Sequence, residues 1–225
     1  MKSSSPKKKL RIAQVAPLWY PVPPNGYGGS EQIVSLLTEE LVCRGHDVTL
    51  FASGDSQTSA KLVAPIGKNL VSQHVPWLSN GDNMRNLLVA FTNADTFDII
   101  HTHIDVFDIL FPPFVKTPAV ATLHNAFWPL NEKAEAQYGD RLRLYMDRKD
   151  GNYVAISDAY RKLCPAPLQW LATVHHGIPI EKFRFNERPK NIFVWLGRVA
   201  PTKGLHVAAK LVKETGEKFA IAGKF

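Results

Sequence analysis

The chain has 225 residues, of which 45% are hydrophobic and 21% are charged, values ordinary for a globular protein. That length allows one complete α/β domain and part of another. No apolar run approaches the ~20 residues that span a bilayer, and the N-terminus lacks the pattern of a signal peptide. With only Cys43 and Cys164, and no Asn-x-Ser/Thr site, the sequence favours a cytoplasmic protein with reduced thiols.

The formal net charge of +7 is concentrated at the N-terminus. Five of these charges come from the first eleven residues and leave +2 for the rest of the chain: Lys2, Lys7, Lys8, Lys9 and Arg11. We interpret residues 1–9 as a disordered basic tail. Weak contact of this tail with an acidic membrane surface stays open, whereas the sequence does not support a nucleic-acid partner.

The first elements after the tail form a strand–loop–helix–strand unit. Leu10–Ala16 predicts a buried strand, and a loop rich in proline and glycine follows over residues 17–29. We expect Ser30 to cap the next helix, which ends at Gly45 in a left-handed turn. Val48–Ala52 predicts the second strand. This arrangement is a right-handed βαβ unit, the building block of parallel sheets.

The alternation continues through residue 176. In chain order the pattern predicts a helix over Met84–Ala94, strands over Phe97–His101 and Ala119–Leu123, a charged helix over Glu132–Arg148, a strand over Tyr153–Ile156, a helix over Ala159–Leu163 capped at Ser157-Asp158, and a strand over Ala172–Val174.

The C-terminal part of the chain predicts a linker and a second unit. Residues 177–190 carry prolines and many charges and predict an interdomain linker. Residues 191–225 then predict a strand over Ile192–Leu196, a helix over Leu205–Glu214 and a strand over Phe219–Ala222. The predicted fold class is therefore α/β: a Rossmann-like, doubly wound parallel sheet over residues 10–176, plus the first βαβ unit of a second Rossmann-like domain over residues 191–225.

The loop between the first strand and first helix carries a cluster of glycines, Gly26-Tyr27-Gly28-Gly29-Ser30-Glu31. Glycines let backbone N–H groups approach an anion, and a helix N-terminus favours phosphate. Glu31 occupies the place of the last glycine in the dinucleotide fingerprint G-x-G-x-x-G, so that motif is incomplete. A tight turn that packs the helix against the strand is the alternative.

Histidines follow two predicted strands that are successive in the chain. His101 and His103 stand at the exit of one strand, and His124 stands at the exit of the next. Residues i and i+2 of an extended chain face the same side, so a metal site would need a third ligand such as Asp105 or His124. Because no tetrahedral ligand spacing is evident, we predict no metal and favour structural histidines over a metal site.

The loop of the second unit, Gly197–Gly204, superficially resembles a P-loop and differs from it at two positions. Thr202 replaces the glycine before Lys203, and Gly204 replaces the Ser/Thr that would hold magnesium. Two cations, Arg198 and Lys203, remain beside a helix N-terminus, where they suit a diphosphate. A solvated basic turn is the alternative.

In their order and spacing these motifs resemble the retaining GT-B glycosyltransferases of family GT4. The similarity runs from about Leu10 to the last residue. The segments that carry it are Pro23–Glu31, Arg44–Val48, Asp98–His103, Ala121–His124, Val154–Ser157, His176–Pro179 and Gly197–Gly204. Consistent with this, the chain contains no Asp-x-Asp, the carboxylate pair with which GT-A transferases bind a metal.

The resemblance implies transfer of a sugar from a nucleotide-diphosphate sugar to an acceptor, with retention and without a metal or cofactor; a UDP-sugar is the favoured donor. His124 matches the family's active-site histidine near the transferred sugar. The residues implied to bind the donor phosphates are Gly28, Gly29, Arg198 and Lys203. The residues implied to line the acceptor side are Tyr27, Glu31, His101 and His103.

One departure from the family concerns the second domain. Its Glu-x7-Glu element, which holds the donor sugar, would lie beyond the last residue of this chain. We therefore expect a truncated chain that is inactive by itself and whose exposed sheet edge favours self-association. Two alternatives stay open: a non-catalytic module that binds phosphate or a nucleotide-sugar, and an NAD-dependent Rossmann enzyme, in which Asp55 would serve as the ribose-binding acid.

Overall fold

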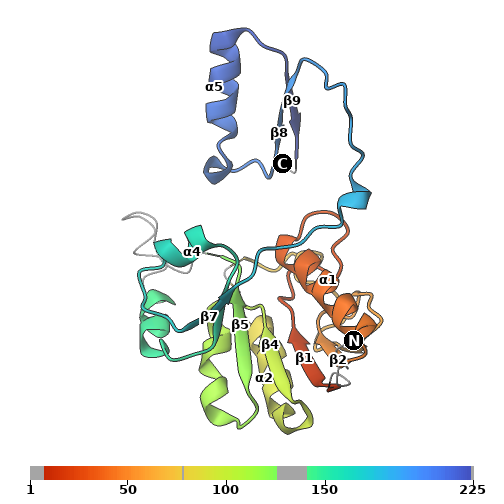
Figure 1. Cartoon of the computed structure of the whole chain (residues 1–225), viewed down its shortest axis with the longest axis vertical. Helices are drawn as coiled ribbons and strands as arrows, with labels where there is room; N and C mark the ends of the chain where they lie inside the picture. The colour runs from red at the N-terminus through yellow and green to blue at the C-terminus, as the bar shows by residue number, and fades with distance from the viewer. Residues whose placement is uncertain (1–7, 78, 126–140, 224–225) are drawn as a thin grey trace, which may run out of the picture. The chain divides into compact units, whose positions relative to one another are not determined.

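A computed structural model of the chain describes residues 8–77, 79–125 and 141–223 (Figure 1). The chain divides into two compact units, Met1–Gly177 and Ile178–Phe225. Each unit contains its own parallel sheet. Most of the predicted basic tail, residues 1–7, lies outside the described residues; Lys8 and Lys9 are exposed coil.

The sheet of the first unit has seven parallel strands. In chain order they are β1 (Arg11–Val15), β2 (Asp47–Phe51), β3 (Lys61–Val63), β4 (Ile99–Thr102), β5 (Ala119–Leu123), β6 (Tyr153–Ala155) and β7 (Trp170–Thr173). Their order across the sheet is β3-β2-β1-β4-β5-β6-β7, which confirms the predicted doubly wound α/β fold. The chain moves outward from β1 in one direction and returns beyond it to β4. The topological switch point, where such sheets bind ligands, therefore lies between β1 and β4.

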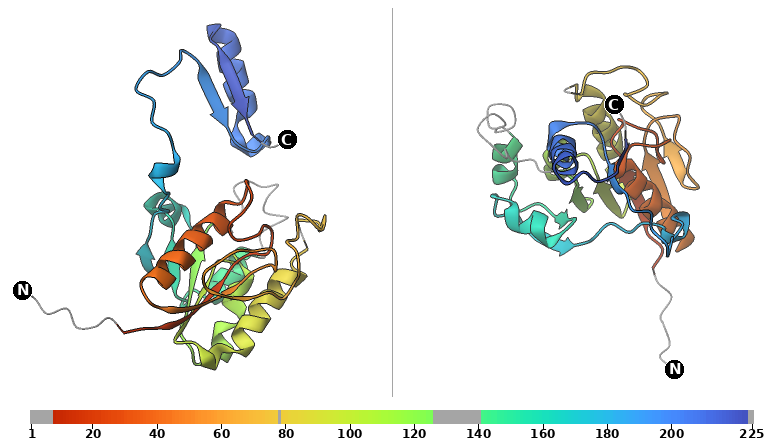
Figure 2. Two further views of the ribbon diagram at one scale, coloured as in Figure 1. Left: turned by 90° about the vertical axis from the view of Figure 1, so that its right-hand side faces the viewer. Right: turned by 90° about the horizontal axis from the view of Figure 1, so that it is seen from above.

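Helices cover both faces of this sheet (Figure 2). They are α1 (Gly29–Cys43), α2 (Gly81–Thr92) and α4 (Asp158–Leu163), together with helical residues 141–147 and the short 3₁₀ turns η1 (Ala94–Thr96), η2 (Phe107–Leu110) and η3 (Pro112–Phe114). Ala13 and Val15 of β1 pack in one apolar cluster with Leu87 of α2. Ala16 packs in another with Val34 of α1. Because side chains alternate along a strand, α1 and α2 cover opposite faces.

The helix ends confirm two of the predicted signals and contradict a third. Gly45 has a φ of 86° in the turn after α1, and the Ser157 hydroxyl accepts a 3.0 Å hydrogen bond from the backbone N–H of Tyr160 at the start of α4, both as predicted. The prediction that Ser30 caps α1 is wrong. The helix begins at Gly29 and its N-cap is Gly28, two residues before Ser30; the cap position makes no side-chain hydrogen bond.

Two elements of the central part of the chain, β3 and the charged helix over residues 132–148, are compared with the prediction. The sequence analysis did not predict β3, an edge strand of three residues. The predicted charged helix over residues 132–148 is helical at 141–147, and its residues 132–140 lie outside the described residues.

The second unit is the predicted βαβ arrangement. Strands β8 (Phe193–Leu196) and β9 (Phe219–Ala222) pair in parallel, with Phe193 opposite Phe219 and Leu196 opposite Ala222. Helix α5 (Leu205–Thr215) connects them and lies beside the two strands (Figure 2). Two 3₁₀ turns complete the described unit: η4 (Ile180–Lys182) before β8, and η5 (Pro201–Lys203) between β8 and α5. Among the described residues of the whole chain, no helix combines the length and apolar character required to cross a bilayer.

Candidate functional site

Polar side chains meet on one face of the sheet at the switch point. Gln14 on β1 lies directly opposite His101 on β4 in the strand register. Neighbouring positions Ala13 and Ile100 pack in the cluster beneath α2, so Gln14 and His101 project from the opposite face, the one that α1 covers. His103 lies two residues after His101 on the same extended stretch. The pairing of β1 with β4 thus brings together Gln14 and His101, which are far apart in the sequence.

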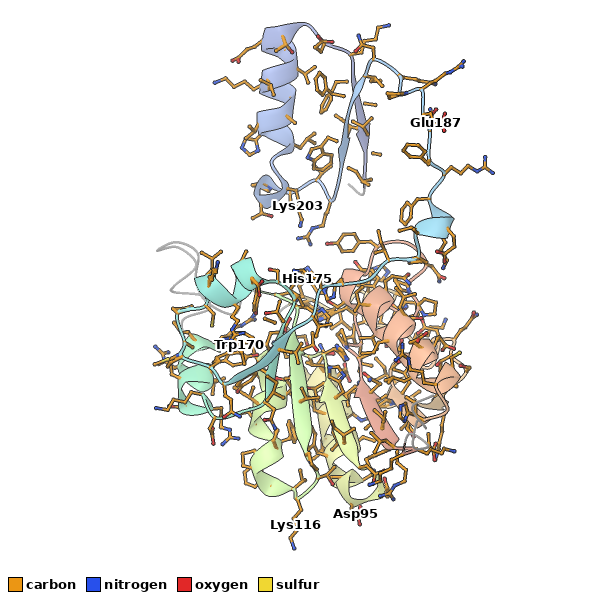
Figure 3. All side chains as sticks on the ribbon, viewed as in Figure 1. Asp95, Lys116, Trp170, His175, Glu187 and Lys203 are labelled. Carbon is orange, nitrogen blue, oxygen red and sulfur yellow. The ribbon has the colours of Figure 1, made fainter. Side chains whose placement is uncertain are left out.

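Four histidines form a connected row, which we call the histidine row: His101, His103, His124 and His176. His103 Nδ1 lies 2.9 Å from His124 Nε2, and His124 Nδ1 lies 3.3 Å from His176 Nε2. The ring centroids of His101 and His103 are 4.2 Å apart. The structure therefore brings together all three histidines singled out in the sequence and adds His176, which follows β7 next to His175 (Figure 3).

Gln14 connects the first two members of the row. Its Oε1 lies 2.9 Å from His103 Nε2 and its Nε2 lies 3.4 Å from His101 Nδ1. The other ring nitrogen of His101 lies 2.8 Å from Thr122 Oγ1 on β5. The sequence analysis missed both Gln14 and Thr122. A signal for Gln14 was present: it is the one uncharged polar side chain in the otherwise apolar stretch Ile12–Ala16.

Burial keeps the inner histidines neutral. His103 is 2% exposed, and burial lowers its pKa well below the ordinary value. Burial lowers the pKa of His101 to about 4. Burial, with smaller contributions from His176 and His101, lowers the pKa of His124 to about 3. At neutral pH these side chains act as hydrogen-bonding groups and not as cations.

Two carboxyl groups accept hydrogen bonds from the row or from residues next to it in the sequence. Asp105 Oδ1 accepts a 2.9 Å hydrogen bond from the backbone N–H of His124, and its Oδ2 accepts one of 2.6 Å from the Asn125 side chain. Asp108 Oδ2 accepts a 2.7 Å hydrogen bond from the Thr102 hydroxyl. Burial raises the pKa of Asp105 to about 6 and that of Asp108 to about 8. Asp105 thus holds the turn after β5 in place. Within the described parts of the chain, no group of three or more His, Cys, Asp or Glu side chains is arranged to hold a metal ion.

The glycine loop ends at the start of α1. Gly28 has a φ of 147°, and a Cβ atom there would lie 2.7 Å from the Cβ of Pro24, so this position requires glycine. Gly29 is exposed, and a Cβ atom there would meet nothing within 4 Å. The first turn of α1 therefore presents open backbone at Gly29, as binding of an anion would require.

The side chain of Tyr27 in this loop is exposed, whereas that of Glu31 in the first turn of α1 is buried. The Tyr27 ring is 41% exposed and packs edge-on against Tyr20 with 5.8 Å between centroids. Glu31 is 4% exposed. Burial raises its pKa to about 7, while hydrogen bonds from the backbone N–H groups of Glu31 and Tyr20 act in the opposite direction. The Glu31 carboxyl group therefore lies beneath the loop, and the acceptor-side assignments stay predictions.

The phosphate-binding residues predicted in the second unit flank its strand–helix loop. Lys203 is exposed at the end of η5, and Figure 3 marks it. Its carbonyl oxygen accepts a 3.0 Å hydrogen bond from the Trp195 indole on β8, which fixes the loop to the strand. Gly204 follows with a φ of 70° and is the N-cap of α5. Arg198 is half-buried at the start of the same loop.

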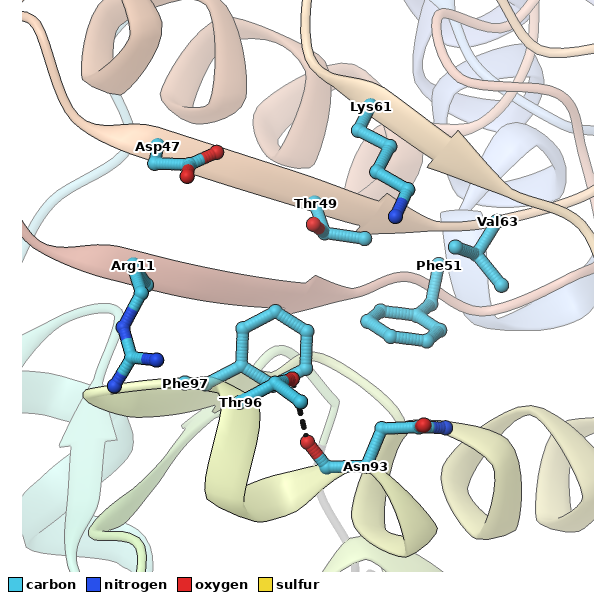
Figure 4. Close-up of a pocket in the computed structure, with 9 residues that line it drawn as sticks. All are labelled: Arg11, Asp47, Thr49, Phe51, Lys61, Val63, Asn93, Thr96 and Phe97. Carbon is cyan, nitrogen blue, oxygen red and sulfur yellow. Dashed lines mark hydrogen bonds between the residues drawn. The ribbon is translucent and has the colours of Figure 1, made fainter.

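Two cavities in the first unit lie apart from these residues. One, of about 340 Å³, is shown in Figure 4; its lining includes Arg11, Asp47 and Lys61, which begin β1, β2 and β3. Arg11 is paired there with Asp98 at 3.0 Å. The other, of about 240 Å³, is lined by residues that include Asp108 and Arg148. Neither lining contains a residue predicted for the site, so neither cavity is the candidate site.

A comparison with known families identifies the family of the chain. Residues 27–182 match the sequence profile of Glycosyltransferase Family 4, well over half of the chain. The chain belongs to glycosyltransferase family 4. The matched segment runs from the end of the glycine loop, through all four members of the histidine row, to η4. No curated protein matches the sequence.

A solved structure of similar fold is itself a glycosyltransferase. The family 4 chain superposes with a TM-score of 0.58 and 22% identity on AviGT4, a glycosyltransferase involved in avilamycin A biosynthesis, over 94% of its own length. A glycosyltransferase from Rickettsia africae gives a TM-score of 0.49 and 14% identity, with 97% of this chain and 69% of that one covered. The chain spans 56% of the length of AviGT4. At these identities the likeness concerns the fold.

Proposed function

We propose that this family 4 chain acts in the transfer of a sugar from a nucleotide-diphosphate sugar to an acceptor. The favoured donor is a UDP-sugar, and the transfer proceeds with retention of configuration and without a metal. The observation that carries the proposal is the histidine row at the switch point of the sheet. It places His124 at the carboxyl end of β5, on the edge where parallel α/β sheets bind ligands. Membership of glycosyltransferase family 4 gives the class of ligand.

Residues are assigned to phosphate binding in each unit by itself. In the first unit, Gly29 offers open backbone at the N-terminus of α1, and the buried Gly28 precedes it as the N-cap. In the second, Arg198 and Lys203 flank the loop that leads into α5. Backbone N–H groups and cations both stabilise the negative charge that develops on a departing diphosphate.

His124 is assigned to the transferred sugar as a neutral hydrogen-bonding group. Its low pKa supports this role, because a neutral imidazole can accept a hydrogen bond from a sugar hydroxyl. The acceptor side is assigned to Tyr27, whose ring is exposed, and with it to Glu31, His101 and His103. The buried positions of His103 and Glu31 support an indirect role for these two residues.

A non-catalytic binding module is the second candidate, and one observation favours it for the isolated 225 residues. The described second unit supplies two strands whose apolar side chains stay exposed, for example Leu196 at 81%. Turnover in a two-domain transferase depends on a donor held in line with its acceptor. We infer that these 225 residues by themselves bind a diphosphate weakly and turn over a nucleotide-sugar poorly.

The test of the phosphate assignment is a charge-matched comparison. The double variant Arg198→Ala/Lys203→Ala and the control Lys210→Ala/Lys213→Ala, which removes two cations from the body of α5, would be titrated with UDP by calorimetry. We expect the first pair to weaken UDP binding about tenfold at low salt, since charge-assisted hydrogen bonds are lost, and the difference to shrink at high salt. Equal affinities for the two double variants across the salt series would contradict the assignment.

A further inference from the structure

The hydrogen bonds of the histidine row determine which ring nitrogen of His124 carries its proton. We propose that Gln14 and His103 are positioning residues that hold His124 as its Nε2–H tautomer, and that His124 Nδ1 is thereby kept as a hydrogen-bond acceptor, covered by His176. The assignment of the tautomer depends only on contacts within the first unit.

The argument begins at the buried end of the row. Gln14 is fully buried, and its carbonyl oxygen Oε1, which can only accept, lies 2.9 Å from His103 Nε2. His103 must therefore carry its proton on Nε2. A neutral imidazole has one N–H group, so His103 Nδ1 is an acceptor. Its partner at 2.9 Å is His124 Nε2, which must donate.

Because a neutral imidazole has one N–H group, the proton positions of His124 and His176 follow in the same way. With its proton on Nε2, neutral His124 presents Nδ1 as an acceptor, and the atom that faces it is His176 Nε2 at 3.3 Å. His176 then donates from Nε2. One amide orientation thus sets the proton positions of three successive histidines. No proton is transferred and no charge is created along the row.

The same orientation of the Gln14 amide also assigns the proton of His101. Its Nε2 group donates toward His101 Nδ1 at 3.4 Å, which leaves His101 Nε2 to donate to the Thr122 hydroxyl at 2.8 Å. A reversed amide would invert every bond in the row and place the His124 proton on Nδ1. The orientation of one buried side chain is therefore the determinant, and the two orientations predict opposite tautomers.

The exposure of His176 indicates from which side a ligand can reach His124. His103 is buried while His176 is exposed, and the His124–His176 contact is 0.4 Å longer than the His103–His124 contact. A ligand can reach a nitrogen of His124 from solvent at the His176 side. If the ligand is a sugar, which rests on the proposed function, its hydroxyl donates to His124 Nδ1 in place of the His176 N–H.

The test is nuclear magnetic resonance of the full 225-residue chain with ¹⁵N-labelled histidine, since long-range ¹H–¹⁵N correlations distinguish Nε2–H from Nδ1–H. We expect Nε2–H for both His103 and His124 in the wild-type chain. Gln14→Leu should shift His124 toward a mixture of tautomers. Thr122→Val, which removes only the His101 branch, should leave His124 unchanged. His46, whose Nδ1 accepts a bond from the backbone N–H of Leu10 at 3.2 Å, is the internal reference.

A second variant examines the exposed end. His176→Ala should move the His124 Nδ1 resonance toward that of an unbonded acceptor and leave the proton on Nε2. A wild-type His124 that carries its proton on Nδ1 would overturn the proposal, and this measurement stands even if Gln14→Leu fails to fold. An unchanged tautomer in a folded Gln14→Leu chain would overturn it as well. Failure of UDP to bind, measured by calorimetry, would contradict the proposed function and leave the tautomer assignment intact.

Discussion

At the scale of single residues, two adjacent glycines in one loop have different reasons to be glycine. Gly28 combines a φ of 147° with a close approach to Pro24, whereas a side chain at Gly29 would enter open space. We expect Gly28→Ala to lower the free energy of unfolding by about 1–3 kcal/mol, the usual cost of backbone strain, and Gly29→Ala to change it by less than about 0.5 kcal/mol. Urea denaturation of the two variants measures the difference. Equal destabilisation by both would show that the loop conformation is not as described.

The buried carboxyl of Asp108 predicts a dependence of stability on pH. Burial raises its pKa in the folded chain to about 8, from an ordinary value of 3.8. Between these values the unfolded chain has lost the proton that the folded chain keeps, so stability falls as pH rises. Asp108→Asn removes this effect. Since each pKa unit is worth about 1.4 kcal/mol, we expect the variant to gain a few kcal/mol over wild type between pH 4 and pH 8.

Denaturation of wild type and Asp108→Asn at pH 5 and pH 8 measures that gain. Asp95→Asn, which changes an exposed aspartate in η1, is the matched control and should follow wild type at both pH values. A constant difference between Asp108→Asn and wild type across this range would contradict the buried, protonated state of Asp108.

At the scale of elements, the two predicted serine caps can be compared directly. Ser157 accepts a hydrogen bond from the Tyr160 N–H at the start of α4, whereas Ser30 lies inside α1 and is not its cap. We expect Ser157→Ala to cost about 1 kcal/mol, the typical value of a lost N-cap. Ser30→Ala should be close to neutral or slightly stabilising, because alanine favours helix interiors. Thermal unfolding of the two variants would check this order, and a larger loss at Ser30 would contradict it.

Much of the fold could be predicted from the sequence because its strands are buried and apolar. The predicted bounds of β5 and β9 agree with the structure to the residue, and His103 and His124 directly follow strands, as predicted. The strand β3 was missed because its three residues, Lys61–Val63, are partly exposed at a sheet edge and give no apolar run. The Ser30 error arose because Gly28 adopts a backbone conformation that starts the helix earlier.

The rest of the site depends on topology that a linear pattern does not contain. Gln14 is 87 residues from His101 and 89 from His103 in the sequence. The three meet only because β1 and β4 are neighbours in the sheet. His176 joins them from the exit of β7. A buried glutamine in an apolar strand signals a polar partner, but the sheet order decides which partner it finds.

At the scale of the whole molecule, the description of the second unit predicts how fast the chain turns over a nucleotide-sugar. The release of UDP or GDP from a panel of nucleotide-sugars, with a mixed lipid and small-phenol acceptor pool, measures turnover. We expect these 225 residues to release nucleotide far more slowly than other family 4 transferases. The reason is that the described second unit has two strands and that its apolar side chains are exposed. Robust release that His124→Ala abolishes would show that these residues suffice for catalysis.

The most direct test of the account is whether the chain binds a nucleotide diphosphate at the residues assigned to it. Uniformly ¹⁵N-labelled chain would be titrated in parallel with UDP, UDP-glucose and NAD, while the amide signals of Gly29 and Lys203 are followed. The account predicts saturable shifts of both signals with UDP and UDP-glucose, weakened by salt, and none with NAD. Saturation by NAD with no response to UDP would contradict it.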